Sequence, residues 1–100
     1  MVKHLVMWRL RASDQDSYLS NFAAIRTAAD AMRSGIDGLR RLEIGFNQSR
    51  IHDAADLALY SEFVSWSALQ AYETHPLHEE LKRLIGPMRL ERRVVDYEMG

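Results

Sequence analysis

The chain has 100 residues, of which 47% are hydrophobic, so it is long enough for one domain of ordinary size with its own core. Its formal net charge is −1 and it has no long basic run, which argues against a nucleic-acid-binding surface. The absence of cysteine excludes disulfides and thiolate chemistry and fits a cytoplasmic protein. No apolar run approaches transmembrane length, so we expect no membrane partner.

The first predicted strand covers residues 3–10, which are rich in strand-forming side chains. Alternation along it puts His4, Val6 and Trp8 on one face and Leu5 on the other. Charged residues interrupt this start, so it lacks a signal-peptide core. We therefore expect the chain to open with a strand of the domain.

A long helix should follow. The serine-to-acid spacing from Ser13 to Asp16 is that of a capping box, and the helical pattern continues to about Arg33. Its apolar positions recur at helical spacing. They are Tyr18, Phe22, Ile25, Ala29 and Met32. Residues 34–38 indicate a helix stop and a turn.

Two further strands are predicted over residues 39–47 and 56–63, joined by a polar hairpin loop over residues 48–55. Each strand alternates between apolar and polar positions. The inward positions are Leu42, Ile44 and Phe46 in the first of them and Leu57, Leu59 and Phe63 in the second.

The segment from Ser65 to His78 carries the most specific pattern in the chain. Ser65 suits a helix N-cap, and Trp66, Leu69 and Tyr72 then recur on one helical face. In one straight helix Tyr72 and His78, six residues apart, would point to different sides.

A helix break changes that expectation. Pro76 disfavours helical geometry at His75 and suits the first turn of a new helix over residues 76–85, which Gly86-Pro87 ends. With a break at this point, the side chains of Tyr72 and His78 can turn toward one pocket.

A final strand over residues 89–99 completes the order β-α-β-β-α-β, the ferredoxin-like pattern of an α+β domain. Helices would cover one sheet face. The first and last strands carry apolar residues on both faces, so the second face should be covered as well, most simply by a second copy of the sheet. We assign Leu5 and Val94 to this dimer face.

These residues resemble those of the stress-responsive α/β-barrel family, also called the dimeric α/β-barrel or Dabb domain. The specific match is His75-Pro76-Leu77-His78 following Tyr72. Weaker matches are Val2 to Val6, Phe63 to Tyr72, and Val94-Val95-Asp96-Tyr97. The resemblance spans nearly the whole chain, and implies a ferredoxin-like subunit over residues 1–100 that pairs with its twin into a closed barrel, with a stress-linked role and, in most relatives, no assigned reaction.

One plant relative in this family is a polyketide cyclase that closes a ring by aldol condensation without a cofactor. The resemblance matches its tyrosine and last histidine to Tyr72 and His78, and its first-strand histidine to His4. The relative also carries a histidine in its third strand, where this sequence reads Asp56-Leu57-Ala58.

Aldol closure needs a base for an acidic C–H and a donor for the developing oxyanion. A histidine suits the first role and a tyrosine hydroxyl the second, so His78 and Tyr72 are the candidate catalytic pair. The alternative is that Tyr72 only packs under the sheet, with His78 at the edge of an apolar helix stripe.

His4, Trp8 and His75 are the candidate ligand-binding residues. His4 also suits a core position, and His75 suits a structural role at the helix break. The His75-x-x-His78 spacing can hold a metal, but no third ligand is evident. We therefore predict no metal and no cofactor.

The remaining ionisable residues are expected to have structural or solvent-exposed roles. His52 should be solvated in the polar loop, and Asp96 should pair with a backbone group or a cation. Two arginine pairs at strand starts are predicted to form a solvated rim. They are Arg40, Arg41, Arg92 and Arg93.

Four functions stay open. The first is a homodimer that binds a small apolar molecule between sheet and helices, and the second is a cofactor-free acid–base catalyst using Tyr72 and His78. The third, a haem-degrading or quinol-oxidising monooxygenase, lacks an evident Asn-Trp-His constellation. The fourth is a dimer without a ligand. A pocket on which His4, Tyr72 and His78 converge would favour the first two, whereas a pocket closed by Trp8 and Trp66 would favour the last.

Overall fold

The structure is a computed structural model that describes residues 1–11, 15–49 and 51–100. The predicted capping box at Ser13 and the side chain of Tyr18 lie outside what it describes. The elements follow the predicted order. They are β1 (Val2–Leu10), α1 (Gln15–Gly35), β2 (Leu39–Phe46), β3 (Leu57–Phe63), α2 (Trp66–Glu73), α3 (Pro76–Ile85), the 3-10 turn η1 (Gly86–Met88) and β4 (Arg89–Glu98).

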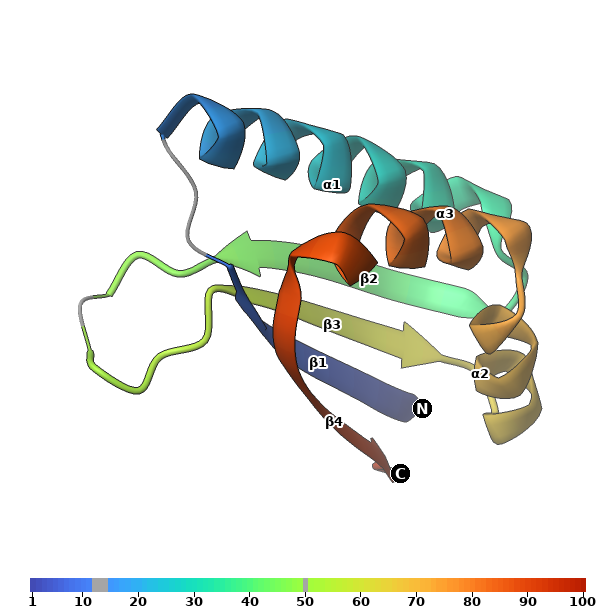
Figure 1. The fold of residues 1–100 in the computed structure, drawn as a ribbon. Helices are drawn as coiled ribbons and strands as arrows, with labels where there is room; N and C mark the ends of the chain where they lie inside the picture. The colour runs from blue at the N-terminus through green and yellow to red at the C-terminus, as the bar shows by residue number, and fades with distance from the viewer. Residues whose placement is uncertain (12–14, 50) are drawn as a thin grey trace.

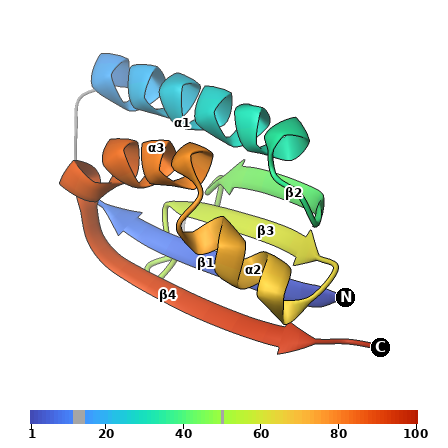
Figure 2. The ribbon, with the colours of Figure 1, turned by 90° about the vertical axis from the view of Figure 1, so that its right-hand side faces the viewer.

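The four strands form one antiparallel sheet in the order β2-β3-β1-β4, which confirms the ferredoxin-like prediction. Figure 1 shows α1 and α3 side by side over one face of the sheet, and α2 beyond the end of β3. Figure 2 shows the same layers from the side, with β4 at the sheet edge. The opposite face carries no helix among the described residues.

The core lies between the sheet and these helices. From α1, Ile25, Ala29 and Met32 are fully buried, as their spacing predicts. From β3, the inward positions Leu57 and Phe63 are buried as well. Apolar spacing therefore identified the helix-facing side of the central elements, because each of those elements has one consistently apolar face.

The dimer-side assignment of Val94 is wrong. Val94 pairs with Val6 across the β1–β4 ladder, whereas Val95 pairs with Leu5. Directly paired residues share a sheet face, so Val94 lies on the helix side and Val95 on the helix-free side with Leu5. Because Val94 and Val95 are equally apolar, the alternation of side chains does not indicate which of them faces the helices.

The helix break forms as predicted. The Ser65 side chain caps α2, and its Oγ accepts a hydrogen bond from the Ala68 N–H at 3.1 Å. At the next start, Pro76 occupies the first turn of α3, and His75 Nδ1 accepts a hydrogen bond from the Leu77 N–H at 3.1 Å. Both caps satisfy backbone donors that would otherwise lack a partner, so two short helices replace one long helix.

Within the described parts of the chain, no helix combines the length and apolar character needed to cross a membrane.

Candidate functional site

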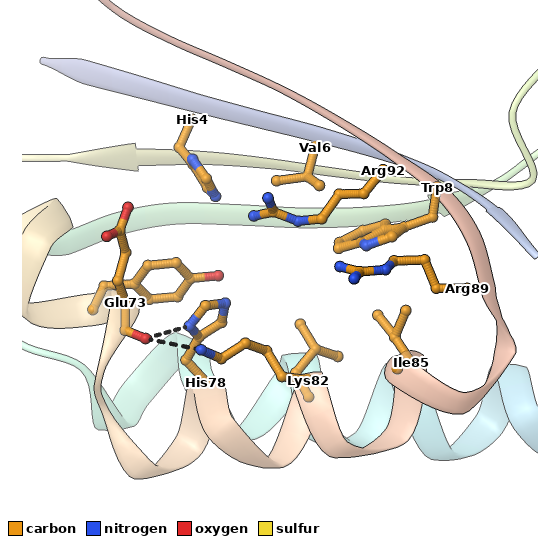
Figure 3. Close-up of a pocket in the computed structure, with 12 residues that line it drawn as sticks. His4, Val6, Trp8, Glu73, His78, Lys82, Ile85, Arg89 and Arg92 are labelled. Atoms are coloured by element: carbon orange, nitrogen blue, oxygen red, sulfur yellow. Dashed lines mark hydrogen bonds between the residues drawn. The ribbon is translucent and has the colours of Figure 1, made fainter.

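A cavity of about 500 Å³ lies between the β1–β4 edge of the sheet and helices α2 and α3 (Figure 3). Its apolar wall comes from Val6 and Trp8 of β1 and from Leu81 and Ile85 of α3. The helix side of β4 stays accessible, and Val94 on that side remains 40% exposed. The cavity therefore opens where the helices leave the edge strand uncovered.

Tyr72 and His78 both line this cavity although they come from different helices. Their rings stack with centroids 4.1 Å apart at an interplanar angle of 29°. The turn at Thr74 and His75 makes this contact possible, because it redirects the chain between the two residues. The predicted convergence of the two side chains on one pocket is what the structure shows.

The hydroxyl group of Tyr72 faces accessible space. Among the described residues, every fully buried side-chain nitrogen and oxygen has a hydrogen-bond partner. No hydrogen bond within that set involves the Tyr72 hydroxyl, although the residue as a whole is 1% exposed. The hydroxyl must therefore reach the cavity. Burial raises the pKa of Tyr72 despite the opposing charge of Arg92, so the phenol stays protonated and can donate a hydrogen bond throughout the neutral range.

The tautomer of His78 follows from its hydrogen bond. His78 Nδ1 lies 3.1 Å from the backbone oxygen of Glu73. A carbonyl oxygen only accepts, so Nδ1 carries the proton and the neutral ring keeps its lone pair on Nε2. Burial lowers the pKa of His78, with smaller contributions in the same direction from Lys82 and His4 and an opposing one from the Glu73 hydrogen bond. His78 is therefore an available base at neutral pH.

His4 is the third polar group at this end of the cavity. Its ring meets Tyr72 edge-on with centroids 5.7 Å apart, and its Nδ1 lies 2.5 Å from Asp96 Oδ1. His4 and Asp96 are direct partners in the β1–β4 ladder, so strand pairing brings them together. The carboxylate accepts from Nδ1–H and fixes the ring so that Nε2 is free. Asp96 was predicted to pair with a cation or a backbone group, and its partner is the site residue His4. This partner could be identified only from the register of β1 against β4.

Positive side chains reach the same cavity. Lys82, Arg89 and Arg92 line it, together with the carboxylate residue Glu73 (Figure 3). Arg92 is exposed, as the solvated-rim prediction requires, and it also lines the cavity from the helix side of β4, opposite Trp8. Its neighbour Arg93 fits that prediction, because it lies on the other face and donates to Glu91 at 3.1 Å.

Two of the three candidate ligand-binding residues lie at the cavity, and the third does not. His4 and Trp8 line the cavity, whereas His75 does not and instead uses Nδ1 to cap α3. Trp66 is also outside the cavity: it is 46% exposed, and its Nε1 donates to Glu98 at 3.2 Å. Asp56 is one of the three residues that stand where the plant relative has its third-strand histidine. It accepts a hydrogen bond from the Leu10 N–H at 2.7 Å and so supports the end of β1.

Histidine, aspartate and glutamate side chains do not gather in threes in a way that could hold a metal ion, within the described ranges of the chain. The Nδ1 atoms of both helix-break histidines are already engaged with backbone groups. The chemistry available from the site is therefore that of His78 Nε2, His4 Nε2, the Tyr72 hydroxyl and the nearby cations.

In a comparison with known protein families, residues 2–99 match the model of the stress-responsive A/B barrel domain, Dabb. A search among curated proteins finds no match.

Solved structures of similar fold include two dimeric ferredoxin-like proteins of unknown function. The one from Bacteroides fragilis has 30% sequence identity and a TM-score of 0.89, and the match covers 98% of this chain and 95% of that one. The one from Thermobifida fusca has 19% identity and a TM-score of 0.85, with 98% and 90% coverage. A hydroxynitrile lyase from Passiflora edulis has 16% identity and a TM-score of 0.79, with 99% and 93% coverage, which shows a shared fold.

Proposed function

Since the chain belongs to the stress-responsive A/B barrel domain family, we propose that it is a homodimer whose subunits each bind a small molecule with an apolar body between sheet and helices. The observation that carries this proposal is the convergence of His4, Tyr72 and His78 on one cavity of about 500 Å³. This volume is in the usual range for ligand sites, and an apolar wall with a few aimed polar groups is typical of them.

The homodimer part of the proposal rests on the helix-free face of the sheet. A sheet face that meets water normally carries polar residues. This face instead includes Met7, Val95 and Tyr97, which are 47%, 52% and 39% exposed in the single chain. The related proteins from Bacteroides fragilis and Thermobifida fusca are dimeric, which supports a second copy as the cover.

Binding is tested with a neutral probe, 4-phenylbutan-2-one, whose ring suits the apolar wall and whose ketone oxygen can accept from Tyr72. Protein NMR at millimolar probe should show chemical-shift changes at the Trp8 indole and at the His4 and His78 rings. His52, exposed in the loop after β2, is the matched control and should not shift. Shifts spread evenly over all four residues, or none at all, would contradict binding in the cavity.

Cofactor-free acid–base catalysis is the second candidate, favoured by the stacking of a neutral imidazole against a protonated phenol. In this proposal His78 Nε2 takes a proton from a carbon next to a carbonyl. The C–H electron pair moves toward the carbonyl oxygen, and the resulting enolate oxygen accepts a hydrogen bond from Tyr72. The enolate carbon then attacks a second carbonyl of the same poly-β-keto chain, and the new alkoxide takes the abstracted proton back from the His78 imidazolium, which completes the aldol closure.

The proton-abstraction step is measured on its own by deuterium exchange at C2 of an acetoacetyl thioester in D₂O. The wild type should accelerate exchange, and Tyr72→Phe and His78→Gln should each slow the catalysed exchange by roughly a hundredfold while the fold survives. Because the pKa of His78 is lowered, the rate should rise with pH from 5.5 and level off near neutrality. His52→Gln should change nothing. A wild type that does not accelerate exchange at any pH between 5.5 and 8 would exclude this second candidate.

A further inference from the structure

We propose that Arg89 and Arg92 form an anion anchor in the cavity, so that its ligand is an organic carboxylate with an apolar body. This inference rests on the proposed function and names the chemical class of its ligand. Both arginines line the cavity, and in Figure 3 both side chains extend from β4 toward it. The anchor is distinct from the Tyr72–His78 pair, which comes from α2 and α3.

A bulge in the sheet puts the two arginines on one face. Residues three apart on a regular strand point to opposite faces. Here the β1–β4 register shifts: Arg9 pairs with Glu91, but Leu10 pairs with Arg89, and Leu90 is the extra residue. Arg89 therefore shares a face with Leu10, the same helix side on which Arg92 lies opposite Trp8. Bulges commonly re-aim a side chain beside a functional site.

Neither guanidinium has a counter-ion within the described part of the chain. No side-chain hydrogen bond or ion pair to a described residue involves Arg89 or Arg92, whereas the side chain of Arg93 on the same strand pairs with Glu91 and that of Arg83 on α3 pairs with Glu80. Both arginines are exposed and both line the cavity, so two positive charges face one ligand site. An anionic ligand group would offset the repulsion between them.

Charge also sets the orientation of the ligand. Glu73 lines the cavity near Tyr72 and His78, and its carboxylate lies at the opposite end from Arg89 in Figure 3. A ligand carboxylate would be repelled by Glu73 and attracted by the arginines. Its apolar body would then lie along Trp8 and Ile85, with its far end beside Tyr72.

The shape of the donors suits an oxyanion such as a carboxylate. A guanidinium offers a planar fork that binds two oxygens of one oxyanion, and two forks side by side can bind one carboxylate from both sides. A phosphate monoester offers the same kind of oxygen pair, and the experiment below includes it as a separate arm.

Calorimetry should compare three ligands of one shape: 4-phenylbutyrate, 4-phenylbutan-1-ol and 3-phenylpropyl phosphate. Wild-type protein should bind the carboxylate at least tenfold more tightly than the alcohol, and 0.5 M salt should reduce that preference. In the Arg89→Gln/Arg92→Gln double variant the preference should disappear while the affinity for the alcohol stays within twofold. Arg83→Gln removes the same charge from the exposed side of α3 and should keep the wild-type preference.

The carboxylate anchor would be overturned by equal affinity for acid and alcohol, by a preference that survives in the double variant, or by a tenfold preference for the phosphate over the carboxylate. If the alcohol binds and shifts the Tyr72 and His78 resonances without any preference for the acid, the proposed function stands and the anchor falls. If neither the acid nor the alcohol binds at millimolar concentration, the anchor falls as well, and the titration with 4-phenylbutan-2-one then decides the proposed function.

Discussion

His78 shows how one buried side chain ties stability to pH. Burial lowers its pKa in the folded protein, while in the unfolded chain it titrates near its ordinary value of about 6.5. Between these two values the unfolded state binds a proton that the native state does not. The free energy of unfolding should therefore rise with pH through that window and level off above about pH 7.

The variant His78→Gln removes this dependence and keeps an amide donor for the Glu73 carbonyl. We expect urea unfolding between pH 5 and 8 to show a shallower slope below pH 6.5 for the variant than for wild type. The difference should be at most about 1.4 kcal/mol per pH unit, since one proton is involved. His52→Gln, in the exposed loop, should retain the wild-type slope. Identical slopes for wild type and His78→Gln would show that His78 is not buried as a neutral base.

At the scale of an element, the break between α2 and α3 decides whether the site exists. The backbone changes direction at Thr74 and His75, and His75 then caps the new helix through its own ring nitrogen. If the two helices were one, Tyr72 and His78 would diverge around the helix axis. The cap is thus a structural role for His75 with a consequence for the cavity.

Loss of this cap is measurable. His75→Ala should lower the free energy of unfolding by about 1 kcal/mol, because the Leu77 N–H loses its side-chain acceptor. His75→Asn restores a good capping group and should recover most of that loss. His52→Ala, which removes the same side chain from an exposed position, should stay within about 0.5 kcal/mol of wild type. An alanine variant as stable as the wild type would contradict the capping role.

The sequence predicts elements well where each has one apolar face, and poorly where two strands must be aligned. The break at Pro76 and the convergence of Tyr72 and His78 follow from local signals. The site roles of Asp96, Arg89 and Arg92 do not, because each depends on which residue of β4 lies opposite which residue of β1. The bulge at Leu90 reverses the face of Arg89, and neither alternation nor composition reveals it.

At the scale of the molecule, the bare sheet face should hold a second subunit. Six of its charged residues form ion pairs within the chain. These pairs are Lys3–Glu62, Arg41–Glu43 and Arg93–Glu91. Apolar side chains such as Leu5 and Val95 lie between them without a cover. Two such faces can therefore meet without leaving the charges of these pairs unmatched, while the apolar area of both leaves water.

Adjacent valines on β4 give a matched test of this arrangement. Val95→Glu places a charge on the helix-free face opposite Leu5, whereas Val94→Glu places the same charge on the helix side opposite Val6. Both residues are accessible in the single chain, at 52% and 40%, so both variants should fold. Burying an unpaired carboxylate between two subunits is costly, so Val95→Glu should weaken dimerisation by at least tenfold in sedimentation at micromolar concentration. Val94→Glu should sediment as the wild type does. If the two variants associate equally well, the helix-free face is not the interface, and a wild type that sediments purely as a monomer would exclude the barrel dimer itself.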